Sequence, residues 1–174
     1  MIRYSVIKEK FPREFVLLQG RGCKWGKCTF CDYHSDTSEN PFEVNRPALE
    51  LVSGLYGVLD VINSGSCMEL DGQTMELLQS IVAEKNIHTL WFEAHWIYRH
   101  KLAAFAALFP GVQVKFRCGV ETFDPVLRKR RIARNLDVMR EHRTQKKYVP
   151  RSDRMPINTS RAALHDMQHV RLAH

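Results

Sequence analysis

Short apolar runs recur along the first 120 residues, and most are closed by Gly, Asn or Ser. Runs of this length, bounded by turn-forming residues, are typical of buried strands. The pattern therefore predicts four strands, at residues 14–19, 57–62, 88–93 and 112–118.

Segments with helical periodicity lie between these runs. One is predicted over residues 72–84, where one face carries Met75, Leu78, Ile81 and Val82. A second is predicted at 47–55, because Pro47 suits a first helical turn. A third is predicted from about 99 to 108. Strands that alternate with helices indicate right-handed βαβ units, so the expected fold class is α/β with a parallel sheet covered by helices.

In such sheets the functional loops follow the carboxyl ends of the strands. The segments that bear Gly, Cys and other polar residues lie there, at 20–31, 63–66, 93–96 and 119–122. A functional site is therefore expected along that edge of the sheet.

Composition indicates the number of domains and the cellular compartment. The 174 residues suit one domain, and no run of eighteen apolar residues predicts a membrane span. The amino-terminal stretch carries charges where a signal peptide needs an apolar segment, so a cytoplasmic protein is expected. Three of the five cysteines fall within nine residues. In a reducing compartment such a cluster indicates metal binding or catalysis rather than a disulfide.

The net positive charge is unevenly distributed along the chain. Residues 131–174 hold ten Lys or Arg and four Asp or Glu, which accounts for six of the seven net positive charges. The body, residues 1–130, is nearly neutral, so nucleic acid is not expected as a partner. Two interpretations of the tail stay open: a basic, partly disordered segment with one helix near 131–142, or out-of-frame translation after a break near codon 130. In both, the tail is expected to lie outside the fold.

The cysteine segment reads Gly22-Cys23-Lys-Trp-Gly-Lys-Cys28-Thr-Phe-Cys31-Asp-Tyr33. Thiolates hold iron–sulfur clusters, and closely spaced cysteines on one loop wrap a single cluster. Cys23, Cys28 and Cys31 would ligate three of four irons and leave the fourth open. Cys67 and Cys118 are expected to be buried, small apolar side chains.

At these residues the sequence resembles the radical S-adenosylmethionine (SAM) superfamily over about residues 14–130. Phe30 matches the aromatic that precedes the last cysteine, and Thr29-Phe30 matches the second spacing, while the first spacing is one residue longer than usual. The resemblance implies a parallel partial (β/α) barrel with about four of its six β/α units present. It also implies a 4Fe-4S cluster and SAM, which the reduced cluster cleaves to a 5′-deoxyadenosyl radical that abstracts substrate hydrogen.

The resemblance further implies positions for cofactor and substrate. The family's Gly-Gly-Glu-like segment after the second strand is replaced here by Asn63-Ser64-Gly65-Ser66, so Asn63, Ser64 or Ser66 would take over its contact with the SAM amino group. Glu121 would accept a ribose hydroxyl, and Phe30 and the Tyr33 backbone would meet the adenine. Glu93 and His95, after the third strand, would contact the substrate, although a solvated histidine is an equal interpretation of His95.

The sequence is also similar to a narrower group, the lyases of queuosine salvage, which release queuine from queuosine or its phosphate. This similarity lies in four segments, GCKWGKCTFCDYH, INSGS, FEAHW and GVETFD. The expected partners are then a small-molecule substrate of the nucleoside class and a flavodoxin- or ferredoxin-type electron donor. Two alternatives remain open. The three cysteines with His34 would make a Cys3His zinc site in a nucleic-acid-binding module. The chain would otherwise be an inactive fragment that exposes a sheet edge.

Overall fold

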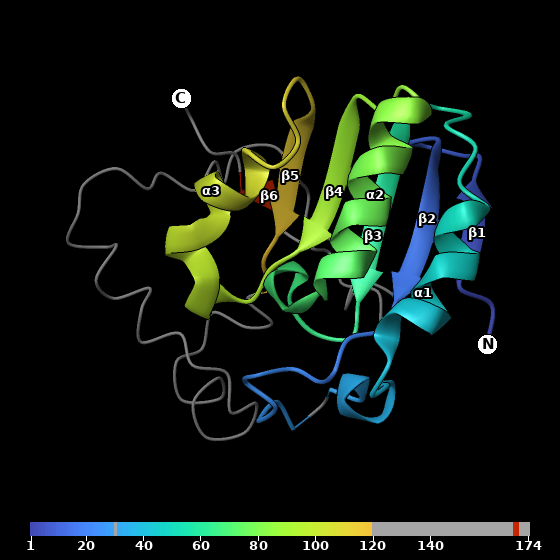
Figure 1. Cartoon of the computed structure of the whole chain (residues 1–174). Helices are drawn as coiled ribbons and strands as arrows, with labels where there is room; N and C mark the ends of the chain where they lie inside the picture. The colour runs from blue at the N-terminus through green and yellow to red at the C-terminus, as the bar shows by residue number, and fades with distance from the viewer. Residues whose placement is uncertain (30, 120–168, 171–174) are drawn as a thin grey trace, which may run out of the picture.

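The computed structural model describes residues 1–29, 31–119 and 169–170 (Figure 1). Its strands are β1 (Tyr4–Ile7), β2 (Arg13–Leu18), β3 (Val58–Asn63), β4 (Thr89–Glu93), β5 (Gln113–Arg117) and β6 (His169–Val170). Its α-helices are α1 (Pro41–Glu50), α2 (Gly72–Glu84) and α3 (Leu102–Ala106). Short 3-10 helices follow three of the strands: η1 (Tyr33–Ser35), η2 (Cys67–Glu69) and η3 (Trp96–Lys101).

The strands form one sheet in the order β1-β2-β3-β4-β5-β6. The neighbouring pairs from β2 to β5 are all parallel, whereas β1 and β6 pair antiparallel with β2 and β5. The four predicted strands and the α/β class are thus confirmed, whereas the sheet as a whole is mixed rather than parallel. Closure of the sheet into a partial barrel stays a prediction.

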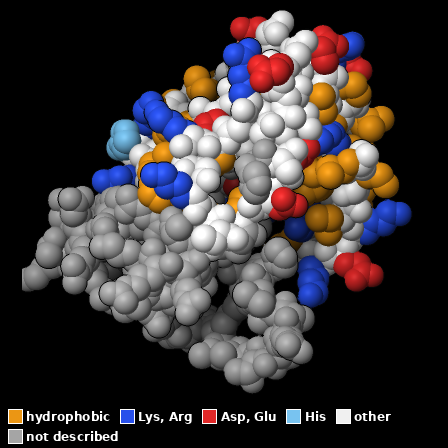
Figure 2. Space-filling model, turned by 90° about the horizontal axis from the view of Figure 1, so that it is seen from below, with side chains coloured by type: hydrophobic (Ala, Val, Ile, Leu, Met, Phe, Trp, Pro, Cys, Tyr) orange, Lys and Arg blue, Asp and Glu red, His pale blue; other side chains and the backbone are white. Residues whose placement is uncertain are grey.

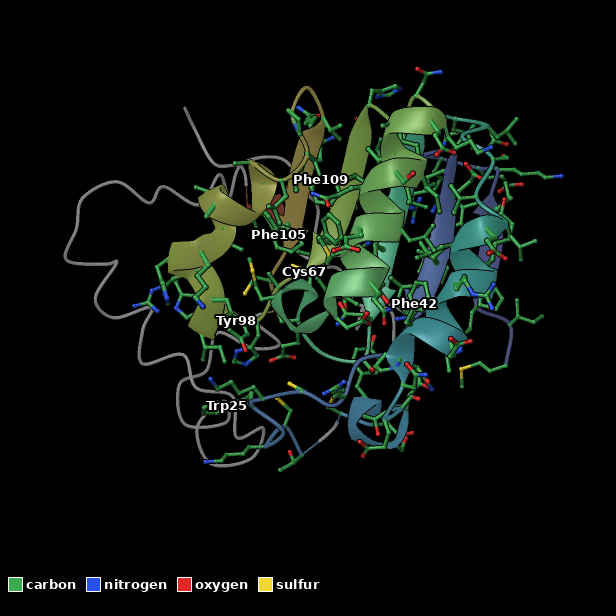
Figure 3. The ribbon with its side chains drawn as sticks, viewed as in Figure 1. Trp25, Phe42, Cys67, Tyr98, Phe105 and Phe109 are labelled. Atoms are coloured by element: carbon green, nitrogen blue, oxygen red, sulfur yellow. The ribbon has the colours of Figure 1, made fainter. Side chains whose placement is uncertain are left out.

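One face of the sheet is the apolar core. Along β2, alternate residues Glu14, Val16 and Leu18 are fully buried, as the two-residue period of a strand requires. The core continues through Leu59, Val61, Leu90 and Phe92 and takes in side chains of α1, α2 and α3. Figure 1 shows α1 and α2 in front of this face, and Figure 3 shows Phe105 and Phe109 of the α3 region beside β4 and β5. Their rings contact the Phe92 ring with centroids 5.1 and 5.7 Å apart.

The helices bear out the sequence only in part. α2 has the predicted bounds, and Asp71 caps it by accepting the Thr74 N–H at 2.9 Å. The prediction for 47–55 was wrong, because the helix begins at Pro41 and Pro47 lies inside it. Both prolines suit a first turn, and Pro41 takes it. The third helix, predicted from about 99, is a 3-10 turn that begins at Trp96 and runs into the short α3.

The ends of the sheet carry two elements that the sequence did not predict. β1 adds an edge strand, and β6 pairs its two residues with Phe116 and Arg117. β6 belongs to the tail that was expected to lie outside the fold, so its pairing departs from that expectation for these two residues. The rest of residues 131–174 lies outside the described residues, and for them the expectation stays a prediction. No helix in the described ranges is long and apolar enough to cross a membrane.

Candidate metal centre

The three cysteines lie on a loop that is closed at its base. Gly20 forms a bridge with Thr37, and the Ser38 N–H donates to the Gly20 carbonyl at 3.1 Å. The Gly20 N–H donates to the Ser64 hydroxyl at 2.9 Å, which ties the same base to the loop after β3. The segment between, residues 21–36, is the cysteine loop. It lies below the carboxyl ends of the parallel strands in Figure 1, where a functional site was expected.

The start of the loop is held by a residue that the sequence reasoning missed. Asn45, in the middle of α1, is fully buried. Its side chain accepts from the Gln19 N–H at 2.6 Å and donates to the Gln19 carbonyl at 2.9 Å. Asn45 thereby satisfies the main chain just where β2 ends, and its amide also donates to the Thr74 hydroxyl at 3.1 Å. The sequence gives no signal for this role, because both the burial of Asn45 and its partners depend on the fold.

The far end of the loop is fixed by an ion pair. The Arg3 guanidinium donates to both carboxylate oxygens of Asp36, at 2.6 and 3.2 Å, and Gln19 adds a further donor at 2.5 Å. The hydrogen bonds from Arg3, aided by that from Gln19, hold the pKa of Asp36 below its usual range. Both ends of the cysteine loop are therefore anchored to β1, β2 and α1.

The cysteines themselves are half-buried. Cys28 and Cys31 share a local turn, in which the Cys31 N–H donates to the Cys28 carbonyl at 3.2 Å. Within the described part of the chain, no three His, Cys, Asp or Glu side chains are gathered closely enough to hold a metal ion. The donor set still fits an iron–sulfur cluster, since three thiols share one anchored loop at the functional edge.

The loop after β3 contributes main-chain and side-chain polar groups. Asn63 and Ser66 are fully buried and Ser64 nearly so. The Ser64 and Ser66 hydroxyls accept the N–H groups of Gly20 and His95, at 2.9 and 3.3 Å. Asn63 donates to the Ser66 carbonyl at 3.1 Å, while its side-chain oxygen has no hydrogen-bond partner among the described residues.

Glu69, which the sequence reasoning did not single out, links three loops. Its carboxylate accepts the Ser66 N–H at 2.9 Å, the Lys24 N–H at 3.0 Å and the Tyr98 hydroxyl at 2.9 Å. Burial, followed by the hydrogen bond to Glu69, raises the pKa of Tyr98. Figure 3 shows Trp25 and Tyr98 below the ends of the strands, with Trp25 on the cysteine loop.

The loop after β4 holds the two residues predicted to meet substrate. Glu93 ends β4 and is half-buried, whereas His95 is 8% exposed. The His95 ring stacks on Trp25 with centroids 5.5 Å apart, and its Nδ1 accepts the Ile97 N–H at 3.3 Å. His95 is thus packed against the cysteine loop rather than solvated.

Tyr33 connects the cysteine loop electrostatically to the strand ends. Its pKa is raised to about 12, first by burial and then by the negative charges of Glu93 and Cys31, against the opposing charge of Arg117. Glu93 is thus one of the charges that act on the Tyr33 hydroxyl.

Several predictions fall outside the described atoms. Phe30, Glu121 and the side chain of His34 are not described, so the adenine, ribose and zinc assignments that involve them stay predictions. Cys67 and Cys118 are buried, as predicted, and burial raises the pKa of Cys67 to about 12. Cys67 therefore stays a neutral thiol at physiological pH.

Figure 2 views the molecule from the carboxyl edge of the strands. On the coloured part of that face, basic and acidic side chains are interspersed rather than sorted into a patch of one sign.

The fold and the site together define a class: an α/β protein with a three-cysteine loop after the first parallel strand and polar loops after the next two. Comparison with solved structures adds a particular relative, a queuine lyase from Clostridium spiroforme bound to SAM and queuine. It shares 42% sequence identity with this chain at a TM-score of 0.74. The match covers 77% of this chain and 59% of the lyase. The chain is a relative of this enzyme, and its resemblance to the radical SAM superfamily is confirmed. No protein-family model and no curated protein matches the chain.

Proposed function

We propose that this chain is a radical SAM protein whose cysteine loop carries a 4Fe-4S cluster and whose activity is the release of queuine from queuosine or its phosphate. The observation that carries the proposal is the anchored three-cysteine loop at the carboxyl edge, in a chain 42% identical to a queuine lyase that binds SAM and queuine. The chain spans 59% of that enzyme's length, so its own activity is part of the proposal.

We assign one task to the cysteine loop and another to the loop after β3. Cys23, Cys28 and Cys31 would ligate the cluster, which supplies the electron that cleaves SAM and begins hydrogen abstraction. The closed base at Gly20 and Thr37 holds these ligands beside the loop after β3. That loop is where the cofactor would bind.

For the amino group of SAM, Asn63 is the favoured contact among the three proposed. The Ser64 and Ser66 hydroxyls already accept main-chain N–H groups, whereas the Asn63 side-chain oxygen is an acceptor not used by the described residues. The N–H groups of the SAM amino group need acceptors, and a buried carbonyl oxygen left unpaired is costly. Gly65, Phe30, Tyr33 and Glu121 would complete the cofactor site as the resemblance implies.

The substrate would lie beside Glu93, which pairs in register with Arg117 on the neighbouring strand. Glu93 would accept a hydrogen bond from the base or ribose. His95 is proposed to act at the same edge through its packing against the cysteine loop, because its ring already stacks on Trp25. A flavodoxin- or ferredoxin-type protein would supply the electron.

The test is anaerobic reconstitution of the full chain, followed by iron and sulfide analysis and an absorbance spectrum. Wild type should hold about four irons, as a 4Fe-4S cluster requires. Replacing Cys23, Cys28 or Cys31 with Ala should abolish iron binding, whereas Cys67→Ala and Cys118→Ala serve as matched controls that retain it.

Three results bear on the assignment separately. Stoichiometric zinc in the native protein would replace the cluster with the Cys3His alternative. Loss of iron only in the two control variants would show that Cys67 and Cys118, and not the cysteine loop, bind the cluster. Chromatographic detection of queuine from queuosine or its phosphate, with SAM and a reductant, tests the lyase step. A chain that holds the cluster and SAM but forms no queuine would be a radical SAM protein without this lyase activity.

A further inference from the structure

The four residues between Cys23 and Cys28 form a segment that docks on the rest of the carboxyl edge. This segment, Lys24 to Lys27, includes the one residue that exceeds the usual spacing of the family it resembles. In the structure it has two separate contacts with other loops, and both lie in its first half.

The first contact is the Glu69 carboxylate. One of its oxygens accepts both the Lys24 N–H, at 3.0 Å, and the Tyr98 hydroxyl, at 2.9 Å. Its other oxygen accepts the Ser66 N–H at 2.9 Å. Three loops that follow three different strands therefore meet on one side chain. The main-chain group that it holds immediately follows Cys23.

The second contact is the stack of Trp25 on His95, which is itself held by Ile97 and Ser66. Between the contact residues and Cys28 the chain turns at Gly26, where φ is 53°. A Cβ there would lie 3.2 Å from the Cys23 carbonyl oxygen, so the segment doubles back tightly on Cys23.

The second half of the cysteine loop is held differently. The bond from Cys31 N–H to the Cys28 carbonyl is internal to the loop and does not involve Glu69. The contacts of Glu69 are thus directed to Cys23 and not to the Cys28–Cys31 turn. This asymmetry is what a test can measure.

We infer that Glu69 is a positioning residue that fixes Cys23 against the loops after β3 and β4. Its role in holding the first cluster ligand rests on the proposed function. Its effect on the Cys23 main chain does not, because the hydrogen bonds exist in the chain without a cluster. A carboxylate suits this task, since it accepts several N–H and O–H donors at once and strengthens each bond by its charge.

The first arm of the experiment needs no metal. The full apo chain is treated with iodoacetamide, and alkylation of each cysteine is followed by peptide mass spectrometry. Glu69→Ala should speed the alkylation of Cys23 about ten- to a hundredfold, which corresponds to the loss of one charge-assisted hydrogen bond. Cys28 should change less than about twofold. The buried Cys67 reports global unfolding and should not change.

Two further variants give reference values for the change in the Cys23 alkylation rate. Glu76→Ala makes the same substitution on the exposed surface of α2 and should leave the Cys23 rate unchanged. Tyr98→Phe removes one of the three bonds to Glu69 but leaves Lys24 in contact, so its effect should be smaller than that of Glu69→Ala.

The second arm uses the reconstituted protein and measures the rate of iron loss to a chelator. Glu69→Ala should release iron faster than both Glu76→Ala and wild type. Equal Cys23 alkylation in Glu69→Ala and wild type would overturn the inference. So would a parallel rise at Cys23, Cys28 and Cys67, since that shows a general loss of stability. A wild-type chain that binds no iron would refute the proposed function, while the first arm would still decide the role of Glu69.

Discussion

The buried carboxylate of Glu14 gives the sharpest prediction for stability. Glu14 is fully buried on β2 and accepts five hydrogen bonds. One oxygen takes the Tyr4 hydroxyl at 2.8 Å with the Ser53 N–H and hydroxyl at 2.7 and 3.0 Å. The other takes the N–H groups of Gly54 and Leu55 at 2.7 and 3.1 Å. Glu14 therefore holds the turn between α1 and β3 against the edge of the sheet.

Glu14→Gln keeps the shape and replaces one acceptor by a donor. If the amide nitrogen faces Gly54 and Leu55, two N–H groups lose their partner. If it faces Ser53, one N–H group loses its partner and two hydroxyls must turn. Each stranded N–H costs about 1–3 kcal/mol, and the bonds that survive lose the charge that strengthened them. We expect a loss of about 3 kcal/mol at pH 7, or roughly 9 °C in Tm for a chain of this length.

The pH dependence adds an independent check. Burial alone would raise the pKa of Glu14, but hydrogen bonds from Ser53, Tyr4 and Gly54 lower it below its ordinary value of 4.5. A depressed pKa means that the carboxylate contributes stability above the unfolded-state pKa and loses it as the pH falls through the folded-state pKa. Since Gln does not titrate, the difference between wild type and Glu14→Gln should shrink in acid.

Urea unfolding at a series of pH values measures this difference, with Glu9→Gln as an exposed control. Tyr4→Phe, which removes one of the five donors, should cost about 1 kcal/mol and keeps the test informative if Glu14→Gln does not fold. The reasoning fails if Glu14→Gln is as stable as Glu9→Gln at pH 7. It also fails if the difference between the two variants stays constant into acid.

Three further predictions concern the sheet, its turns and the tail. Asp60→Asn should lose about 3–5 kcal/mol in urea unfolding, because two arginines are left with a neutral partner inside the protein, and a loss below about 1 kcal/mol would contradict this. Gly54→Ala and Gly111→Ala start from the same φ of 77°, but only at Gly54 would the new Cβ overlap a neighbour, the Lys85 carbonyl. Thermal unfolding should therefore show Gly54→Ala as the less stable by about 2 kcal/mol or more, and equal midpoints would refute the steric argument. Removing residues 131–174 should leave the iron content of the reconstituted protein unchanged, and loss of iron on trimming would show that the tail contributes to the fold.

The predictable part of the fold follows from signals that are local in the chain. The apolar runs of β2, β3, β4 and β5 and the one-sided periodicity of α2 require only neighbouring residues to be recognised. β1 was missed because a four-residue edge strand pairs on one side and shows no continuous apolar run. α1 was displaced because two prolines each suit a first turn, and only packing shows which one occupies it.

The residues of the candidate site also divide into those with a local sequence signal and those without one. The cysteines carry their chemistry in their spacing, so their loop and edge could be predicted. Asn45 and Glu69 could not, because each acts on main-chain groups from distant segments. Of the three donors to Glu69, only Ser66 follows a sequence pattern, the Ser-x-x-Glu of a capping box. Lys24 and Tyr98 come from loops after two other strands, so their contacts with Glu69 have no sequence pattern.

The face of the sheet opposite the helices explains why the carboxyl edge suits a ligand. Asp60, Trp91 and Lys115 lie side by side across β3, β4 and β5, and Glu93 and Arg117 form the next row toward the edge. Lys115 and Arg117 approach the Trp91 ring, at 5.0 and 5.8 Å from its centroid, and Arg117 is paired with Asp60. A parallel sheet is usually apolar on both faces, because both faces are covered. In-register charges around an aromatic ring instead fit the proposed substrate site, because binding sites place a few polar groups on an apolar wall. Since this row runs toward the cysteine loop, cofactor and substrate would meet where the proposed hydrogen abstraction needs them.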